Sequence, residues 1–113
     1  MRYFVTGGAG FIGSNMVDRL LSLGNEVVVY DNFSTGRREF LENALTYDSF
    51  MLVEGDTLDY GKLKEAMEGS EFVFHFAANA DVRMGCEHPK KDLEQNTIAT
   101  FHVLEAMREN VIK

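Results

Sequence analysis

The sequence feature that most constrains the fold is a glycine-rich stretch near the N-terminus, Thr6-Gly7-Gly8-Ala9-Gly10-Phe11-Ile12-Gly13-Ser14. It follows an apolar run, Tyr3–Val5, and leads into a segment whose apolar residues recur at helical spacing. Glycines at every third position, Gly7, Gly10 and Gly13, permit a positive φ, let a pyrophosphate approach the backbone, and let a helix pack closely on a strand. A helix N-terminus also offers N–H groups and a positive dipole end to an anion. The stretch therefore predicts a strand, a turn and a helix that together bind a dinucleotide.

A second apolar run, Val27–Tyr30, ends in Asp31, about 20 residues beyond the glycines. An acid at this place accepts hydrogen bonds from the adenosine ribose of a dinucleotide. The alternative is that Asp31 only caps the following turn. The order strand, glycines, helix, strand and acid favours the ribose interpretation.

Two arginines, Arg37 and Arg38, follow in a polar loop that begins at Asn32. An arginine here would favour NADP by pairing with its 2′-phosphate, whereas the acid at the strand end repels that phosphate. Because Asp31 occupies the discriminating position, we expect NAD. The alternative for the two arginines is a solvated helix start.

The remaining pattern predicts an α/β fold, a Rossmann-type doubly wound parallel sheet with strand order 3-2-1-4. We expect strands at Arg2–Thr6, Glu26–Tyr30, Phe50–Glu54 and Phe72–Phe76. We expect helices at Phe11–Leu23, Tyr60–Met67 and Lys90–Arg108, and a weak one at Glu39–Leu45. In the last long helix, the residues expected on or near the buried face are Leu93, Ile98, Phe101, Leu104 and Met107.

At 113 residues the chain is expected to be one domain, residues 1–113, and short for a complete dinucleotide-binding fold. The order 3-2-1-4 amounts to one half of a doubly wound sheet plus one strand, so we expect a truncated sheet. The fourth strand would then have an uncovered apolar edge, which predicts self-association, as a homo-oligomer or through that edge.

Composition excludes several classes of partner. The net charge of -7 argues against nucleic-acid and anionic-membrane binding. No apolar run is long enough to span a membrane, and no leader-like segment precedes the first strand, so a cytoplasmic location is expected. The single cysteine, Cys86, and three histidines without ligand spacing, His75, His88 and His102, predict no metal site.

With these residues in place, the chain resembles the N-terminal part of the NAD-dependent nucleotide-sugar epimerase/dehydratase family of extended short-chain dehydrogenases/reductases, typified by UDP-glucose 4-epimerase. Thr6–Ser14 is similar to the family's TGGAGFIGS turn, and Asp31–Arg38 to its DNxSTGRR loop. Gly55-Asp56 resembles its acid after the third strand, although the pair alone is equally typical of a turn. His75–Ala80 is similar to its HLAAxA segment. Asp92–Met107 is similar to its N-x-x-G-T-x-N-V-L-E-A helix, with Ala99 and His102 departing from that pattern.

The resemblance implies NAD as the cofactor and assigns its contacts. Pyrophosphate contacts are implied for Gly7, Gly10, Phe11, Ile12 and Gly13, and ribose contacts for Asp31, Asn32 and Ser34. Adenine contacts are implied for Asp56 and Thr57, further cofactor contacts for Ala77, Ala78 and Asn79, and a place behind the nicotinamide for Asn96.

The family's chemistry, in which NAD takes a hydride from a sugar carbon, depends on a Tyr-x-x-x-Lys pair and a nearby serine or threonine. This sequence contains Tyr60-Gly61-Lys62-Leu63-Lys64, which we do not interpret as catalytic because it follows the third strand rather than the fifth. We therefore predict no catalytic residue, and we expect the catalytic segment and sugar domain to be absent. A nucleotide sugar is then expected only in the complete enzyme, with Arg83 and Met84 the candidates to touch it here.

The expected function is thus the NAD-binding portion of a nucleotide-sugar epimerase or dehydratase. One alternative is a stand-alone NAD-binding or sensing module that acts through a protein partner. Another is a fragment that binds nothing tightly. The sequence does not select one sugar nucleotide, nor epimerase over dehydratase or reductase chemistry.

Overall fold

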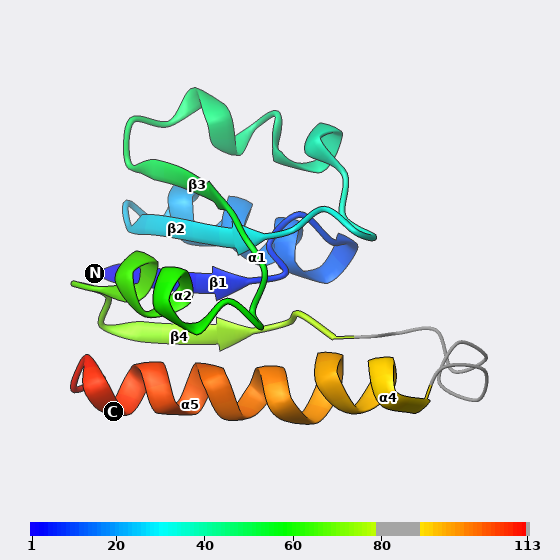
Figure 1. Ribbon diagram of the computed structural model, residues 1–113. Coiled ribbons are helices and arrows are strands. Elements are labelled where there is room, and N and C mark those ends of the chain that lie inside the picture. Colours follow the sequence, from blue (N-terminus) through cyan, green and yellow to red (C-terminus); the bar gives the residue numbers. More distant parts are fainter. Residues whose placement is uncertain (79–88, 113) are drawn as a thin grey trace.

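A computed structural model describes residues 1–78 and 89–112, and these residues form one sheet of four parallel strands (Figure 1). The strands are β1 (Arg2–Thr6), β2 (Glu26–Asp31), β3 (Phe50–Glu54) and β4 (Phe72–His75). Their order is β3-β2-β1-β4, which confirms the predicted Rossmann-type sheet. The register places Thr6 beside Tyr30 on one side and beside His75 on the other. The carboxyl ends of β1, β2 and β4 therefore lie together at one edge of the sheet.

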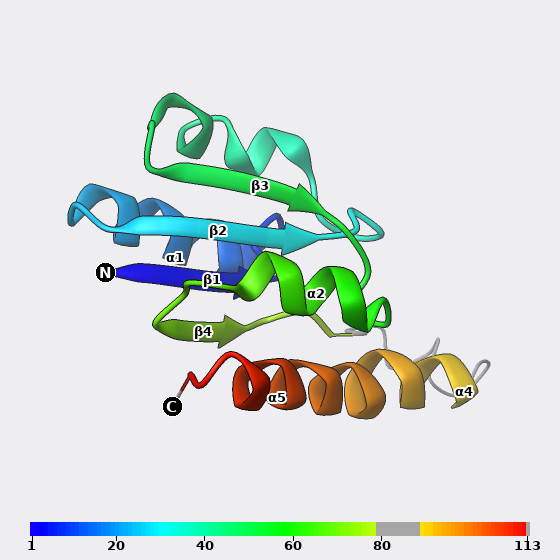
Figure 2. The same cartoon turned by 60° about the vertical axis from the view of Figure 1, so that its left-hand side comes forward.

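Helices cover both faces of the sheet. Helix α1 (Phe11–Ser22) lies on one face, and α2 (Tyr60–Met67) lies on the other, as the two views in Figures 1 and 2 show. On the α1 face the buried side chains include Val5, Val17, Leu20, Leu21, Val27 and Val29. On the α2 face they include Phe4, Val28, Tyr30, Leu63 and Met67. Strands β1 and β2 are buried on both faces, which explains their nearly continuous apolar sequence.

The weak helix expected at Glu39–Leu45 is replaced by two short 3₁₀ turns, η1 (Arg38–Leu41) and η2 (Ala44–Thr46). Leu41 and Ala44, one from each turn, are fully buried in the α1-side core. The segment thus crosses the sheet face with only two anchoring side chains. That is too few to impose the regular period of an α-helix.

The last helical segment corrects the predicted buried face. It consists of α4 (Pro89–Asp92), a π-helical stretch η3 (Leu93–Ile98) and α5 (Ala99–Glu109). The residues of α5 that are buried are the small ones, Ala99, Val103 and Ala106. The predicted residues Leu93, Phe101 and Leu104 are instead 50%, 60% and 60% exposed.

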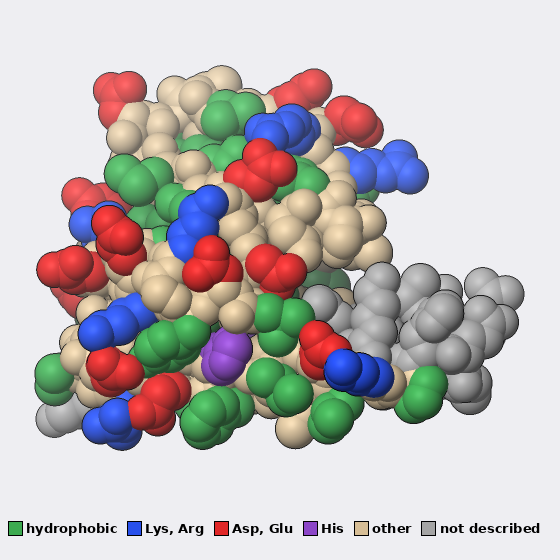
Figure 3. All heavy atoms as spheres, viewed as in Figure 1, with side chains coloured by type: hydrophobic (Ala, Val, Ile, Leu, Met, Phe, Trp, Pro, Cys, Tyr) green, Lys and Arg blue, Asp and Glu red, His purple; other side chains and the backbone are tan. Residues whose placement is uncertain are grey.

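The physical reason is that α5 packs against α2 and β4 through its small side chains, and apolar residues also occupy its outer face. When apolar residues occur on every face of a helix, the sequence pattern does not indicate which face is buried. A π turn also adds a residue per turn and rotates the positions that follow. Of the other two predicted residues, Met107 packs against the α2-side core and Ile98 is half-buried. Hydrophobic side chains gather along α5 at the lower edge of Figure 3.

The outer strand β4 carries a row of aromatic side chains. The ring of Tyr3 on β1 stacks on Phe72 and Phe74, with centroids 5.5 Å and 5.8 Å away, and Phe74 stacks on Phe76. Phe72 remains 44% exposed. In the described part of the chain, no helix is both long and apolar enough to cross a membrane.

Candidate functional site

A cavity of about 370 Å³ opens at the carboxyl ends of the strands. Its walls come from the glycine turn and first turn of α1, from the end of β2 and its loop, and from the residues that follow β3 and β4. Ligands of open α/β sheets collect at this edge, where the strand order reverses. In this sheet the reversal lies between β1 and β4.

The glycine turn lies against the end of β4. Gly7 has φ +69°, and a side-chain carbon at this position would lie 2.7 Å from the backbone nitrogen of Ala77. At Gly13 such a carbon would collide with the carbonyl oxygen of Gly7. Both positions therefore require glycine for the fold itself, because the turn, the helix and β4 pack backbone to backbone. Gly7 and Gly13 also line the cavity.

The N-terminus of α1 faces the same cavity through Gly10, Phe11, Ile12 and Gly13. Gly10 is the N-cap residue and makes no side-chain cap, and the first turn contains no acidic residue. The first N–H groups of a helix have no partner within the helix. This end of α1 therefore offers N–H donors and a positive dipole end to an anion.

Asp31 is 9% exposed and lines the same cavity. Its Oδ2 accepts a hydrogen bond from Ala9 N–H at 2.9 Å, and its Oδ1 accepts one from Phe33 N–H at 2.8 Å. The carboxylate thus caps a turn, as in the alternative raised by the sequence, and it also holds the glycine turn. Two carboxylate oxygens offer about four acceptor sites, so acceptor capacity remains for a ligand hydroxyl.

Most of the other predicted site residues lie around this cavity. Asn32, Ser34, Thr57, Ala77 and Ala78 line it. The side chain of Asn32 accepts a hydrogen bond from Ser34 N–H at 3.0 Å, which shapes the loop after β2.

Two predicted residues that the structure describes are not among those lining the cavity. Asp56 accepts the Leu58 N–H with its carboxylate at 2.9 Å and the Tyr30 hydroxyl with its carbonyl at 2.8 Å, so it shapes the turn after β3. Asn96 lies in η3 and is not a lining residue. Asn79 lies outside the described residues, as do Arg83, Met84, Cys86 and His88.

The loop arginine Arg38 is engaged at the surface. Its guanidinium lies 3.0 Å from the Glu54 carboxylate and 4.4 Å above the ring of Phe33. Arg37 donates its backbone N–H to the Ala9 carbonyl at 3.0 Å. These contacts fold the loop back onto the glycine turn.

Sequence reasoning missed several lining residues, among them Thr35, Gly36, Gly55 and Phe76. Gly36 packs against Ala9, where a side-chain carbon would lie 2.7 Å from the Ala9 methyl group. The run Ser34-Thr35-Gly36 was visible as a turn, but nothing in it indicated a contact with the distant glycine turn.

The sequence model of the NAD dependent epimerase/dehydratase family matches residues 3–113. The chain belongs to this family. The predicted cofactor, NAD, agrees with the family's description.

Named members of the NAD dependent epimerase/dehydratase family match nearly the whole chain. A UDP-glucose 4-epimerase of Mycolicibacterium smegmatis is 42% identical over 111 residues, which cover 96% of this chain and 35% of that protein. A dTDP-glucose 4,6-dehydratase of Mycobacterium tuberculosis is 38% identical over 116 residues, covering 100% of this chain and 34% of that one. The crystal structure of Thermus thermophilus UDP-glucose 4-epimerase in complex with NAD matches with a TM-score of 0.89 and 37% identity, over 100% of this chain and 35% of that one. The chain therefore spans about a third of the length of these relatives.

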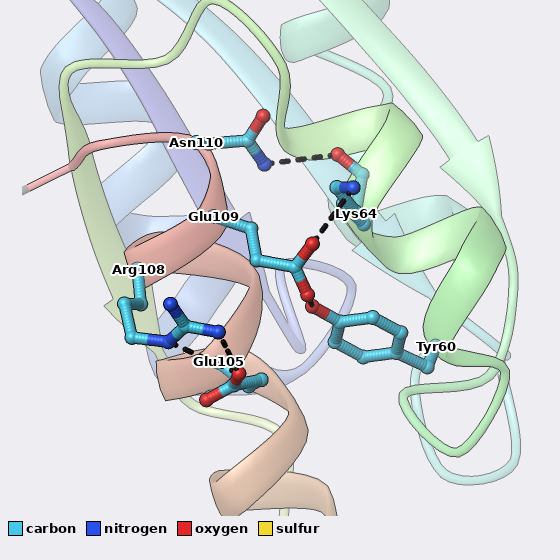
Figure 4. Close-up of polar contacts among 6 residues, drawn as sticks. All are labelled: Tyr60, Lys64, Glu105, Arg108, Glu109 and Asn110. Atoms are coloured by element: carbon cyan, nitrogen blue, oxygen red, sulfur yellow. Dashed lines mark hydrogen bonds and ion pairs between the residues drawn. The ribbon is translucent and has the colours of Figure 1, made fainter.

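The Tyr-x-x-x-Lys pair of the epimerase/dehydratase family has a counterpart in sequence at Tyr60 and Lys64, but it lies between α2 and α5 rather than at the cavity (Figure 4). The Tyr60 hydroxyl donates to the Glu109 carboxylate, and Lys64 Nζ lies 2.9 Å from the same carboxylate. The hydrogen bond to Glu109 raises the pKa of Tyr60 to about 12. A catalytic tyrosine needs a lowered pKa, so this pair works as a helix clamp.

His102, a departure from the family pattern, has a structural role. Its Nδ1 lies 2.9 Å from the Thr57 carbonyl oxygen, which ties α5 to the loop after β3. Within residues 1–78 and 89–112, no three His, Cys, Asp or Glu side chains are grouped to hold a metal ion.

Proposed function

We propose that residues 1–113 bind the adenosine diphosphate half of NAD in a nucleotide-sugar epimerase or dehydratase. The first turn of α1 receives the pyrophosphate, Asp31 accepts hydrogen bonds from the adenosine ribose, and the loop beyond β3 borders the adenine through Thr57. Ala77 and Ala78 form the floor beyond the pyrophosphate.

The observation that carries this proposal is that Asp31 and the N-terminal residues of α1 line one cavity. A dianionic pyrophosphate and a ribose diol require an N–H donor set beside a carboxylate acceptor. The cavity volume of about 370 Å³ lies within the range of small-molecule sites.

NAD is preferred over NADP in this proposal. The Asp31 carboxylate would repel a 2′-phosphate on the ribose that it binds. Of Arg37 and Arg38, the two arginines that could neutralise such a phosphate, Arg38 is paired with Glu54 and stacked on Phe33.

NAD supplies hydride acceptance and return in the complete enzymes. The residues described here bind and orient it, while the clamp at Tyr60 and Lys64 takes no part. We propose that the proton-transferring pair and the sugar site lie outside residues 1–113, so a nucleotide sugar binds only to the complete enzyme. A cytoplasmic location stays a prediction of the sequence.

Calorimetric titration of the chain with NAD, ADP-ribose, NADP and nicotinamide mononucleotide tests the proposal. We expect NAD and ADP-ribose to bind with dissociation constants within about tenfold of each other, a difference of about 1.4 kcal/mol. NADP should bind at least about tenfold more weakly than NAD. Nicotinamide mononucleotide binding as well as ADP-ribose, or no binding of any of the four, would contradict it.

A further inference from the structure

A chain of hydrogen bonds runs from Ala77, which lines the cavity, through β1, β4 and α5 to the π-helical segment. Ala77 N–H donates to Thr6 Oγ1 at 3.2 Å, and Thr6 Oγ1 lies 2.6 Å from His75 Nδ1. On the other side of the ring, His75 Nε2 lies 3.0 Å from Thr100 Oγ1. The Thr100 hydroxyl in turn donates to the Asn96 carbonyl at 2.6 Å. The imidazole of His75 therefore joins the glycine turn to η3.

Each hydroxyl in this chain has one proton, and that fixes the direction of every hydrogen bond. The Thr100 proton is used on the Asn96 carbonyl, so Thr100 Oγ1 must accept from His75 Nε2–H. In a neutral ring, Nδ1 is then the acceptor and receives the Thr6 proton. Thr6 Oγ1 is left with its lone pairs free to accept from Ala77 N–H. One arrangement, with the Nε2–H tautomer of His75, satisfies all the groups.

The surroundings favour that neutral ring. Thr6 is fully buried and His75 is half-buried. Burial lowers the pKa of His75 below its usual value of 6.5. A charged ring would donate from both nitrogens, and the Thr6 proton would then lose its acceptor.

We infer that His75 is a positioning residue for dinucleotide binding, which in its Nε2–H tautomer fixes the Thr6 hydroxyl so that Ala77 is held against Gly7. This rests on the proposed function for the identity of the ligand. Ala77 and Gly7 both line the cavity, and their backbones meet so closely that Gly7 admits no side chain. The Phe76 N–H to Thr6 carbonyl bond, at 3.1 Å, holds the strand ends together, and the Thr6 Oγ1 to Ala77 hydrogen bond extends this contact by one residue into the cavity floor. The His75 ring thus links η3, through Thr100, to the cavity floor.

The first test needs no ligand. Nitrogen-15 NMR of the His75 ring at neutral pH should show a protonated Nε2 and an unprotonated Nδ1, and the Ala77 amide should be protected from hydrogen exchange. An Nδ1–H tautomer or a charged ring at neutral pH would overturn the inference. Failure of the proposed function would leave this result unchanged, so the two are distinguishable.

The second test compares variants by ADP-ribose titration. His75→Leu removes both ring hydrogen bonds and should weaken ADP-ribose binding about tenfold, the size expected for one buried hydrogen bond. His75→Asn places an acceptor where Nδ1 stands, so it should recover most of the affinity and the Ala77 amide protection. Thr100→Val should speed exchange of the Ala77 amide.

Thr46→Val is the matched control. Thr46 donates to the Asn43 carbonyl, three residues back, at 2.6 Å, as Thr100 donates to the carbonyl four residues back, but Thr46 lies at an exposed site. It should change neither affinity nor Ala77 protection. If His75→Leu does not fold, the affinities and Ala77 protection of His75→Asn and Thr100→Val test the inference. Equal affinity and equal Ala77 protection in wild type and the folded variants would overturn the inference.

Discussion

The backbone N–H of Ala9 donates to the Asp31 carboxylate at 2.9 Å, across 22 positions of sequence. The acid that we propose as the ribose ligand therefore also holds the glycine turn in place. Phe33 N–H occupies the other carboxylate oxygen at 2.8 Å. Substitution of Asp31 will consequently affect folding as well as binding, and the two effects must be measured separately.

Asp31→Asn should destabilise the fold by about 1–3 kcal/mol, because its NH₂ group replaces one of two acceptors that face backbone N–H groups. It should also relax the preference for NAD over NADP, because the repelling charge is gone. Urea unfolding and titration with both dinucleotides measure the two effects. Asp48→Asn removes the same charge away from the cavity and should change neither. Unchanged stability in Asp31→Asn would contradict the dual role.

Gly13→Ala should destabilise the fold by several kcal/mol, because its methyl group would collide with the Gly7 carbonyl oxygen and overpacking of this kind costs about 1–3 kcal/mol or more. Gly61→Ala is the control. Gly61 lies in α2 with no atom within 4 Å of the added carbon. That change should stabilise by about 0.5–1 kcal/mol, the difference in helix propensity. Thermal unfolding of both variants checks the prediction, which a stable Gly13→Ala would contradict.

The strands and the glycine turn were predictable because their signals are local. Phe50–Glu54 and Tyr60–Met67 have the expected bounds, since short apolar or amphipathic runs there are bordered by turn formers. The buried face of α5 was not predictable from the sequence, because apolar residues occur on both faces of this helix. Contact with α2 buries the face that carries the small residues.

Polar contacts between residues far apart in the chain could also not be predicted from the sequence. Thr6 and His75 are 69 positions apart, and His75 and Thr100 are 25 apart. Each residue looked like part of a strand or a helix, and no local pattern pairs them. At Asp56 the local pattern was visible but ambiguous, because a Gly-Asp pair is typical of both a ligand contact and a turn. In the structure its carboxylate accepts the Leu58 N–H of a turn.

Tyr60 should form its phenolate only near pH 12, because ionisation would break its hydrogen bond to the Glu109 carboxylate. A raised pKa means that this bond contributes stability fully below the unfolded value of about 10 and loses it as pH rises toward 12. Glu109→Gln should move the pKa of Tyr60 back toward the ordinary tyrosine value of 10.0. Ultraviolet difference absorbance of the variant against the wild type measures this, because the contribution of Tyr30, whose pKa is also raised to about 12, chiefly by burial, should be the same in both proteins.

Glu105→Gln is the matched control for the Tyr60 titration. It removes the same charge one turn earlier on α5, where Glu105 pairs with Arg108. Glu105 also raises the pKa of Tyr60, but less than Glu109 does, so the shift should be smaller. If the two variants shift the titration equally, the Tyr60 to Glu109 hydrogen bond is not the main cause.

The last prediction concerns self-association through β4, which among the described residues pairs with β1 alone. An apolar edge strand is a template for pairing with another chain, and a lysine on it opposes that pairing. Phe72→Lys should therefore weaken self-association about tenfold in sedimentation velocity over a concentration series. Phe101→Lys introduces the same charge on the outer face of α5, where Phe101 is 60% exposed, and should have little effect. If Phe101→Lys dissociates the chain and Phe72→Lys does not, the α5 face is the contact surface. A wild-type chain that stays a monomer at high concentration would contradict self-association altogether.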